Sequence, residues 1–154
     1  KDLIIFEDKM DKVAKNLYMC TDDGSYGFHG NVTVMLDELV TNRGMEYNQA
    51  IVIGPMIMMK FACLATKKLN IPTIVSLNTI MVDGTGMCGA CRISIGDDVK
   101  FACVDGPEFD GWLVNFDEAM KRQQMFKSEE GRKTLRKQDG PTHSSPNCQI
   151  GGKH

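Results

Sequence analysis

The chain of 154 residues and 17.1 kDa is long enough for one domain with a small additional module, and it is too short for two full-size domains. A content of 42% hydrophobic and 25% charged residues is typical of a globular protein and excludes a wholly disordered chain. The formal charge of −2 does not indicate a charged partner. No apolar run reaches the roughly 20 residues that a membrane span needs. The short apolar start at residues 3–6 cannot serve as the core of a secretory signal, so we expect a cytoplasmic protein without membrane or nucleic-acid partners.

The first 80 residues alternate between two hydrophobic patterns. Continuous apolar runs, which a strand buried in a parallel sheet requires, lie at residues 3–6, 17–20, 50–53 and 73–77. Helical spacing lies at residues 8–16, 32–42 and 56–69. Pro55 suits the first position of the third helix, because an N–H group there would have no helical partner. The alternation predicts an α/β fold with a parallel sheet.

The remaining residues predict a small module and a C-terminal helix. Residues 81–111 are rich in glycine and contain three cysteines and a predicted hairpin with strands at residues 92–95 and 99–102. Asn115 and Glu118 resemble a capping box, which predicts a helix from Asn115 to about residue 127. From Lys121 onward, 8 basic and 3 acidic residues form a basic tail, of which residues 140–154 are expected to be disordered. The predicted divisions are therefore residues 1–80, 81–111 and 112–154.

Four potential metal ligands in the glycine-rich segment have an informative spacing. Asp83, Cys88, Cys91 and Cys103 follow the pattern D-x4-C-x2-C-x11-C, which is the ligand pattern of plant-type [2Fe-2S] sites with aspartate in the first position. The glycines between them leave room for backbone N–H groups to approach the sulfur atoms of a cluster. Aspartate can replace a thiolate because ferric iron accepts a hard oxygen donor.

Two other interpretations of these cysteines remain open. The three cysteines together with Asp83 or a histidine could hold zinc, although a zinc ribbon usually has two C-x2-C pairs and this chain has one. The cysteines could also be reduced thiols without a metal. With zinc, the chain would be an interaction module whose basic tail docks on an acidic partner or on nucleic acid.

Two loops before predicted helices are candidates for binding a nucleotide. They follow the predicted strands at residues 17–20 and 50–53 and contain Gly24 and Gly54, which would allow a ligand to approach the backbone. Loops of this kind also occur for purely geometric reasons, and neither of the two loops contains a G-x-G-x-x-G sequence. The spacing by itself therefore leaves the nucleotide site undecided.

Four sequence strings resemble a known family. They are TDDGSYGFHG at residues 21–30, IGPMIMMK at 53–60, VSLNTIMVDGTGMCGACR at 75–92 and FACVDGPEFDG at 101–111. They resemble the C-terminal half of electron-transfer subunits in the ferredoxin–NADP reductase-like group. That group includes the dihydroorotate dehydrogenase electron-transfer subunit and the small subunit of NADH-dependent reduced ferredoxin:NADP oxidoreductase. The second of these is more similar, because it also has aspartate in the first ligand position.

The resemblance implies a function and a set of site residues. Electrons would pass from NAD(P)H through FAD to a [2Fe-2S] cluster and then to a larger catalytic subunit or to ferredoxin, with no catalytic acid or base in this chain. The cluster ligands would be the four residues already identified by their spacing. The implied pyridine-nucleotide contacts are Asp22, Gly24, Ser25, Gly54, Pro55 and Met58. A non-catalytic electron-transfer module that binds the cluster without oxidising NADH is the second reading.

The resemblance also predicts an N-terminally incomplete nucleotide-binding domain. The chain has no counterpart of the FAD barrel found in such subunits, and it would begin at the second strand of the nucleotide domain. The predicted strands at residues 3–6 and 50–53 would then flank an unfilled central position with unpaired backbone groups. We expect another chain, an exchanged strand or a homo-oligomer to complete the sheet.

Overall fold

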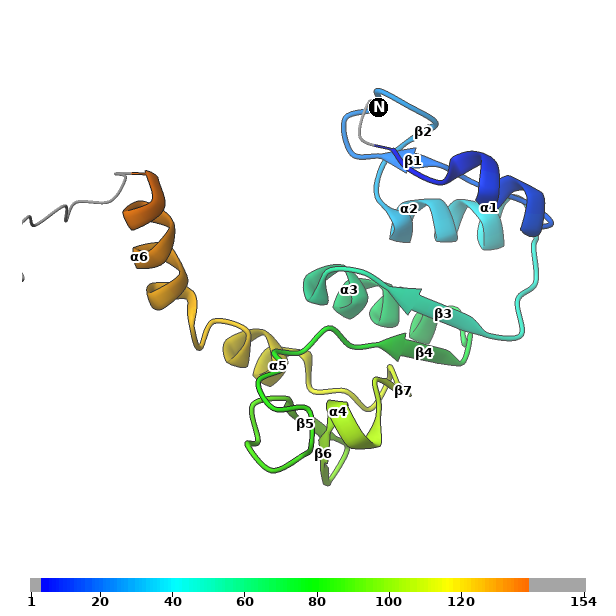
Figure 1. Cartoon of the computed structure of the whole chain (residues 1–154). Coiled ribbons are helices and arrows are strands. Elements are labelled where there is room, and N and C mark those ends of the chain that lie inside the picture. The colour runs from blue at the N-terminus through cyan, green and yellow to red at the C-terminus, as the bar shows by residue number, and fades with distance from the viewer. Residues whose placement is uncertain (1–3, 139–154) are drawn as a thin grey trace, which may run out of the picture.

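The computed structural model describes residues 4–138, which form a mixed α/β structure with three small sheets (Figure 1). The elements in chain order are α1 (Glu7–Val13), β1 (Cys20–Thr21), β2 (Phe28–His29), α2 (Val32–Asp37), the π-helical segment η1 (Glu38–Asn42), β3 (Ala50–Ile53), α3 (Met56–Lys68), β4 (Thr73–Ser76), β5 (Arg92–Ile95), β6 (Asp98–Phe101), α4 (Ala102–Asp105), β7 (Glu108–Asp110), α5 (Phe116–Arg122) and α6 (Lys127–Gln138).

The central sheet has the order β3-β4-β7. β3 and β4 are parallel and are connected by α3, as the alternating pattern predicts. α3 begins at Met56, as predicted, but Pro55 is the N-cap residue before the helix and not its first helical residue. β7 was not predicted, because its three residues are too few to show a periodic pattern. It pairs antiparallel with β4 and thereby connects the glycine-rich segment to the sheet of the first 80 residues.

The strand predicted at residues 3–6 is wrong for residues 4–6, the part that the structure describes. Phe6 has a φ of 62°, and its carbonyl oxygen accepts hydrogen bonds from the N–H groups of Lys9 and Met10. The chain therefore enters α1 at this point, one residue before the predicted start of the helix. A strand is stable only when its backbone groups are paired, and none of the strands described within residues 4–138 pairs with these residues.

The strand predicted at residues 17–20 is shorter and lies later in the chain than expected. β1 contains only Cys20 and Thr21 and pairs in parallel with β2, which was not predicted. The turn between them is held by Thr21, whose hydroxyl donates to the carbonyl of Tyr26 at 2.9 Å. The predicted single parallel sheet is thus replaced by a separate two-stranded sheet and the central three-stranded one.

The outer edge of β3 is open among residues 4–138. β3 is the terminal strand of its sheet, with β4 as its partner. Ile51 and Ile53, which share one face of β3, are 66% and 71% exposed. An apolar strand with one unpaired edge and one uncovered face is unfavourable in water.

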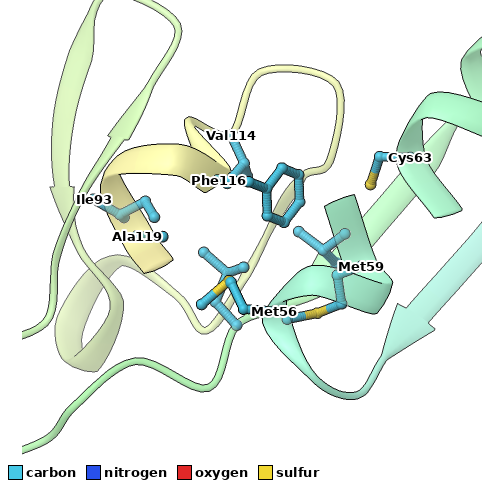
Figure 2. Packing of buried hydrophobic residues seen from close by; sticks show 9 residues of the cluster. Met56, Met59, Cys63, Ile93, Val114, Phe116 and Ala119 are labelled. Carbon is cyan, nitrogen blue, oxygen red and sulfur yellow. The ribbon is translucent and has the colours of Figure 1, made fainter. Parts of the chain in front are cut away.

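The hydrophobic core lies between the central sheet and the glycine-rich module. Figure 2 shows Met56, Met59 and Cys63 from α3 facing Val114, Phe116 and Ala119 from α5 and the segment before it. Ile93 from β5 is fully buried in the same cluster. Because one core contains residues from all three predicted divisions, the glycine-rich module packs directly against the sheet. The domain boundaries expected at residues 80 and 111 stay predictions.

The C-terminal half contains the predicted hairpin and helix with small differences. β6 begins at Asp98, one residue earlier than expected. The side chain of Asn115 caps α5 by accepting the N–H of Glu118 at 3.1 Å, but the helix ends at Arg122. A second helix, α6, follows after a turn and was not predicted. The expected disorder of residues 140–154 concerns residues outside the described range. Among the described helices, none is both long and apolar enough to cross a membrane.

Candidate functional site

The four predicted metal ligands lie in or beside the glycine-rich loop that precedes β5. Asp83 and Cys88 are in the exposed loop, Cys91 is the residue before β5, and Cys103 is in the first turn of α4. The hairpin of β5 and β6 returns the chain so that α4 lies beside the loop. The Sγ atoms of Cys91 and Cys103 are 3.2 Å apart, although the two residues are 12 positions apart in the sequence.

Asp83 and Cys88, the other two predicted ligands, also lie close to each other in this loop. The N–H groups of Ala90 and, to a smaller extent, of Asp83 lower the pKa of the Cys88 thiol, while the nearby carboxylate charge of Asp83 opposes this effect. The hydroxyl of Thr85 donates a hydrogen bond to the Asp83 carboxylate. The predicted ligands therefore occur as two pairs, one in the exposed loop and one at the partly buried start of the hairpin and α4.

The thiols of the second pair have a different environment. Cys91 is 2% exposed, and its thiol, together with burial, raises the pKa of the Cys103 thiol. The N–H of Gly86 acts in the opposite direction on Cys103. The Cys103 thiol therefore favours its protonated state, because a thiolate beside the Cys91 sulfur has no cation among the described residues to balance its charge. A bound metal would supply this cation.

Three glycines of the loop have a backbone conformation that favours glycine. Gly84, Gly86 and Gly89 have φ values of 81°, 85° and 67°, in the left-handed region that other residues adopt only with strain. A Cβ atom on Gly84 would have no neighbour within 4 Å, so this backbone borders open space. The loop thus combines exposed N–H groups, low steric bulk and four oxygen or sulfur donors, which fits an iron–sulfur cluster chemically.

The four candidate ligands do not converge on one point. Within residues 4–138, no three histidine, cysteine, aspartate or glutamate side chains converge to hold one ion. A structural zinc site needs four convergent ligands, whereas a two-iron cluster shares its four protein ligands between two metal atoms.

The predicted nucleotide residues are only partly brought together. Asp22, Pro55 and Met58 line a hollow of about 420 Å³ between the β1 end, α2 and α3. Gly24 and Ser25 do not line this hollow; the N–H of Ser25 instead bonds to the Asp23 carboxylate at 3.0 Å. Gly54 is also outside the lining.

Gly54 has a close packing contact in the structure, and its predicted role in nucleotide binding stays a prediction. A Cβ atom at this position would lie 2.5 Å from Cε of Met58, so a larger residue here would require the flexible end of the methionine side chain to move. This packing contact does not require a ligand. Met58 itself borders the hollow.

Several residues near these sites were missed by the sequence analysis. Asn31 caps α2 through hydrogen bonds from the N–H groups of Thr33 and Val34, both 3.1 Å long, and it also lines the hollow. An asparagine directly before a helical pattern is a recognisable cap signal. Arg122, whose guanidinium contacts the cysteine loop, gave no such signal, because the contact joins residues 33 positions apart.

Comparisons with known proteins agree with the candidate cluster site. Residues 78–115 match the family model described as the iron–sulfur cluster binding domain of dihydroorotate dehydrogenase B. This range includes all four predicted ligands. The resemblance stated from the sequence is therefore confirmed, although the match does not test the individual ligands.

The relatives extend this similarity over most of the chain. A protein of Clostridium beijerinckii described as an uncharacterized protein in the adh 3′ region is 62% identical over 99% of this chain and 51% of its own length. The dihydroorotate dehydrogenase B electron transfer subunit homolog of Thermotoga maritima is 46% identical over 84% of this chain and 45% of its own length.

A solved structure is also similar. It is a chain of an NADH-dependent reduced ferredoxin-NADP oxidoreductase, studied for flavin-based electron bifurcation, with a TM-score of 0.73 and 42% identity over 88% of this chain and 49% of that chain. At this identity the likeness supports common ancestry as well as a common fold. The chain thus spans about half the length of the relatives that it matches.

Proposed function

We propose that the chain is the cluster-bearing relay of a flavin-dependent oxidoreductase. The proposal is supported by the match of residues 78–115 to the iron–sulfur cluster binding domain of dihydroorotate dehydrogenase B and by the similarity of the chain to electron-transfer subunits. Electrons would come from NAD(P)H through FAD, which would be held mostly by residues outside this chain, and would leave to a larger catalytic subunit or to ferredoxin. FAD converts a two-electron donor into single electrons, and a [2Fe-2S] cluster carries these one at a time. A cytoplasmic location belongs to the same proposal.

The observation that carries the proposal is the pairing of the candidate ligands. Asp83 and Cys88 would bind one iron, and Cys91 and Cys103, with sulfur atoms 3.2 Å apart, would bind the other. Thr85 would orient the Asp83 carboxylate through its hydroxyl, while the N–H groups near the Cys88 sulfur stabilise its thiolate form. The chain's own role is to hold these donors in place and to set the charge around them.

The test is metal analysis of the full chain after anaerobic reconstitution with iron and sulfide. We expect two irons and two sulfides per chain, with a visible absorption spectrum that is lost in Cys91→Ser. Cys63→Ser is the matched control, because Cys63 is a buried core thiol of α3 and should leave the spectrum unchanged. Stoichiometric zinc in place of iron, or colour that survives in Cys91→Ser, would contradict the proposal.

The nucleotide part of the proposal depends on the hollow between α2 and α3. Asp22, Pro55 and Met58 border it, and its volume of about 420 Å³ would accept part of a dinucleotide. Titration of the chain with NADH and with NADPH, followed by protein fluorescence, tests this. Binding that is unaffected by Met58→Ala and by Asp22→Ala would exclude this hollow as the site.

A docking surface for the redox partner would lie around the cysteine loop. Met81, Val82, Met87 and Val104 are 50%, 63%, 89% and 56% exposed, so an apolar rim borders the exposed Cys88. Apolar contacts around a redox centre would exclude water and allow close approach of the partner. Met87→Asp should weaken electron transfer to the partner without changing the visible spectrum.

The open edge of β3 supports the proposal that a further strand completes the central sheet. This strand would come from a second copy or from polypeptide outside residues 4–138, and it would also bring cover for Ile51 and Ile53. Light scattering over a range of concentrations tests the second copy. A monomer whose β3 amides exchange slowly on both edges would contradict the need for another strand.

A further inference from the structure

Arg122 is the last residue of α5, and its side chain reaches across to the cysteine loop. Its Nη2 atom donates a hydrogen bond of 2.7 Å to the carbonyl oxygen of Gly89 and lies 3.5 Å from that of Ala90. Gly89 and Ala90 are the two residues between Cys88 and Cys91. The guanidinium therefore holds the backbone of the segment that joins one candidate ligand pair to the other.

The contact is built into the fold. The side chain of Arg122 is half-buried, and its Nε atom is fully buried without a hydrogen-bond partner in the described part of the chain. Burying a guanidinium nitrogen without a partner is unfavourable, so the surrounding packing must hold it there. Gly89, which accepts the bond, is one of the loop residues with positive φ, so the carbonyl direction depends on a backbone conformation that needs external support.

The neighbours of Arg122 on α5 fix the helix to the same module. Glu118, one turn earlier, accepts a hydrogen bond from the hydroxyl of Ser94 in β5. Gln123 donates to the carbonyl of Asn78 at 2.9 Å, where the chain enters the module. α5 thus binds the start, the loop and the hairpin of the module, and Arg122 makes the contact nearest to the ligands.

Arg122 also places a permanent positive charge beside the loop. Arg92, which follows Cys91, is directed to Glu118, with 3.9 Å between its Nη2 and the carboxylate, and its charge is partly balanced there. No carboxylate is paired with Arg122 among the ion pairs of the described residues. Its charge is therefore available to act on the electron acceptor.

We propose that Arg122 is a positioning residue that fixes the Cys88–Cys91 loop and raises the reduction potential of the cluster held there. The proposal rests on the proposed function. Reduction adds one negative charge to the cluster, and a nearby cation stabilises that charge, so removal of the cation makes reduction harder. The hydrogen bond to Gly89 also keeps the ligand-bearing backbone in place, with or without metal.

The test compares three variants of the full chain. Arg122→Gln removes the charge and the fork of donors, Arg122→Lys keeps the charge and loses the fork, and Lys121→Gln removes a charge from the exposed preceding residue of the same helix. The measurements are iron and sulfide content, the midpoint potential from a redox titration followed by absorbance, and hydrogen exchange of residues 84–90 in the metal-free chain.

We expect Arg122→Gln to lower the midpoint potential, with about a tenfold change in the ratio of reduced to oxidised cluster, equivalent to about 59 mV for one electron. Arg122→Lys should retain most of the potential, and Lys121→Gln should retain all of it. Both Arg122 variants should exchange the loop amides faster than the unchanged chain when metal is absent. A structural role alone would reduce cluster content and leave the potential of the remaining cluster unchanged.

The proposal is overturned if Arg122→Gln has the potential of the unchanged chain, or if Lys121→Gln shifts it equally. If Arg122→Gln takes up no cluster, the comparison moves to Arg122→Lys, and unchanged loop exchange in that variant overturns the positioning role. Failure of the unchanged chain to bind iron and sulfide refutes the proposed function instead. The exchange of the metal-free loop would still decide whether Arg122 fixes it.

Discussion

Replacement of Ile93 by alanine should destabilise the protein strongly, because this side chain connects the cluster module to the core. Ile93 is 0% exposed and belongs to the same buried cluster as Met56, Met59 and Phe116. The substitution removes three methyl or methylene groups, each worth about 0.8 kcal/mol when buried, or about 2.4 kcal/mol together. The cavity that remains adds to this loss, so we expect the free energy of unfolding to fall by about 3–4 kcal/mol.

Urea denaturation of the full chain measures this change, with the fluorescence of Trp112, the single tryptophan, as the probe. Ile93→Val removes one methylene and should cost about 0.5–1.5 kcal/mol. The matched control is Val99→Ala on the other strand of the hairpin. Val99 is 57% exposed, so its truncation should cost less than about 1 kcal/mol.

The reasoning requires that Ile93→Ala lowers the free energy of unfolding more than Ile93→Val does, and that Ile93→Val lowers it at least as much as the control Val99→Ala. If Ile93→Ala costs no more than Val99→Ala, the hairpin does not depend on the shared core, and the module would have to be treated as an independent unit. Equal costs for the two Ile93 variants would show that the lost volume is refilled by movement of the neighbours.

Three further predictions concern the loop and the helix cap. In the reduced, metal-free chain at pH 8, iodoacetamide should label Cys88 before Cys63, as measured by peptide mass spectrometry. N–H groups lower the pKa of Cys88, whereas burial raises the pKa of Cys63 to about 11, so that about one Cys63 thiol in a thousand is ionised at this pH. Faster labelling of Cys63 would contradict this prediction. Gly86→Ala should lower stability by at least about 1–2 kcal/mol, because φ at this position is 85° and the new Cβ would lie 3.2 Å from Val104. A melting temperature equal to that of the unchanged chain would refute the loop conformation. Asn115→Ala should cost about 1 kcal/mol by removing the cap of α5, while Asn115→Asp should restore the loss in the same melting assay.

Local signals in the sequence were sufficient for much of the fold. The apolar runs of β3 and β4, the start of α3 after Pro55 and the cap at Asn115 all depend on residues within a few positions of one another. Such features follow from periodicity, fixed φ angles and side-chain capping, which need no knowledge of distant segments. The reciprocal half of the capping box failed for a long-range reason. The N–H of Asn115 bonds to the carbonyl of Ser94, and Glu118 turns to the Ser94 hydroxyl.

For the candidate cluster site, the residue types and their spacing were visible in the sequence. The individual roles of the four cluster ligands, and of the six residues expected to contact the nucleotide, stay predictions. The resemblance and the match over residues 78–115 agree on where the site lies. Spacing could not show that Cys91 and Cys103 have adjacent sulfur atoms, because that depends on the hairpin bringing α4 back to the loop.

Tertiary structure alone decided the contacts between distant segments. It placed Arg122 on the carbonyl of Gly89, added β7 to the edge of β4 and left residues 4–6 outside any sheet. Each outcome depends on which partners are available in three dimensions: a backbone group is paired only if packing brings a donor or acceptor to it, and a sequence records the group without recording its neighbour. The chain itself therefore determined which chemistry was possible, and the packing of α5 and the hairpin determined where the donors and charges meet.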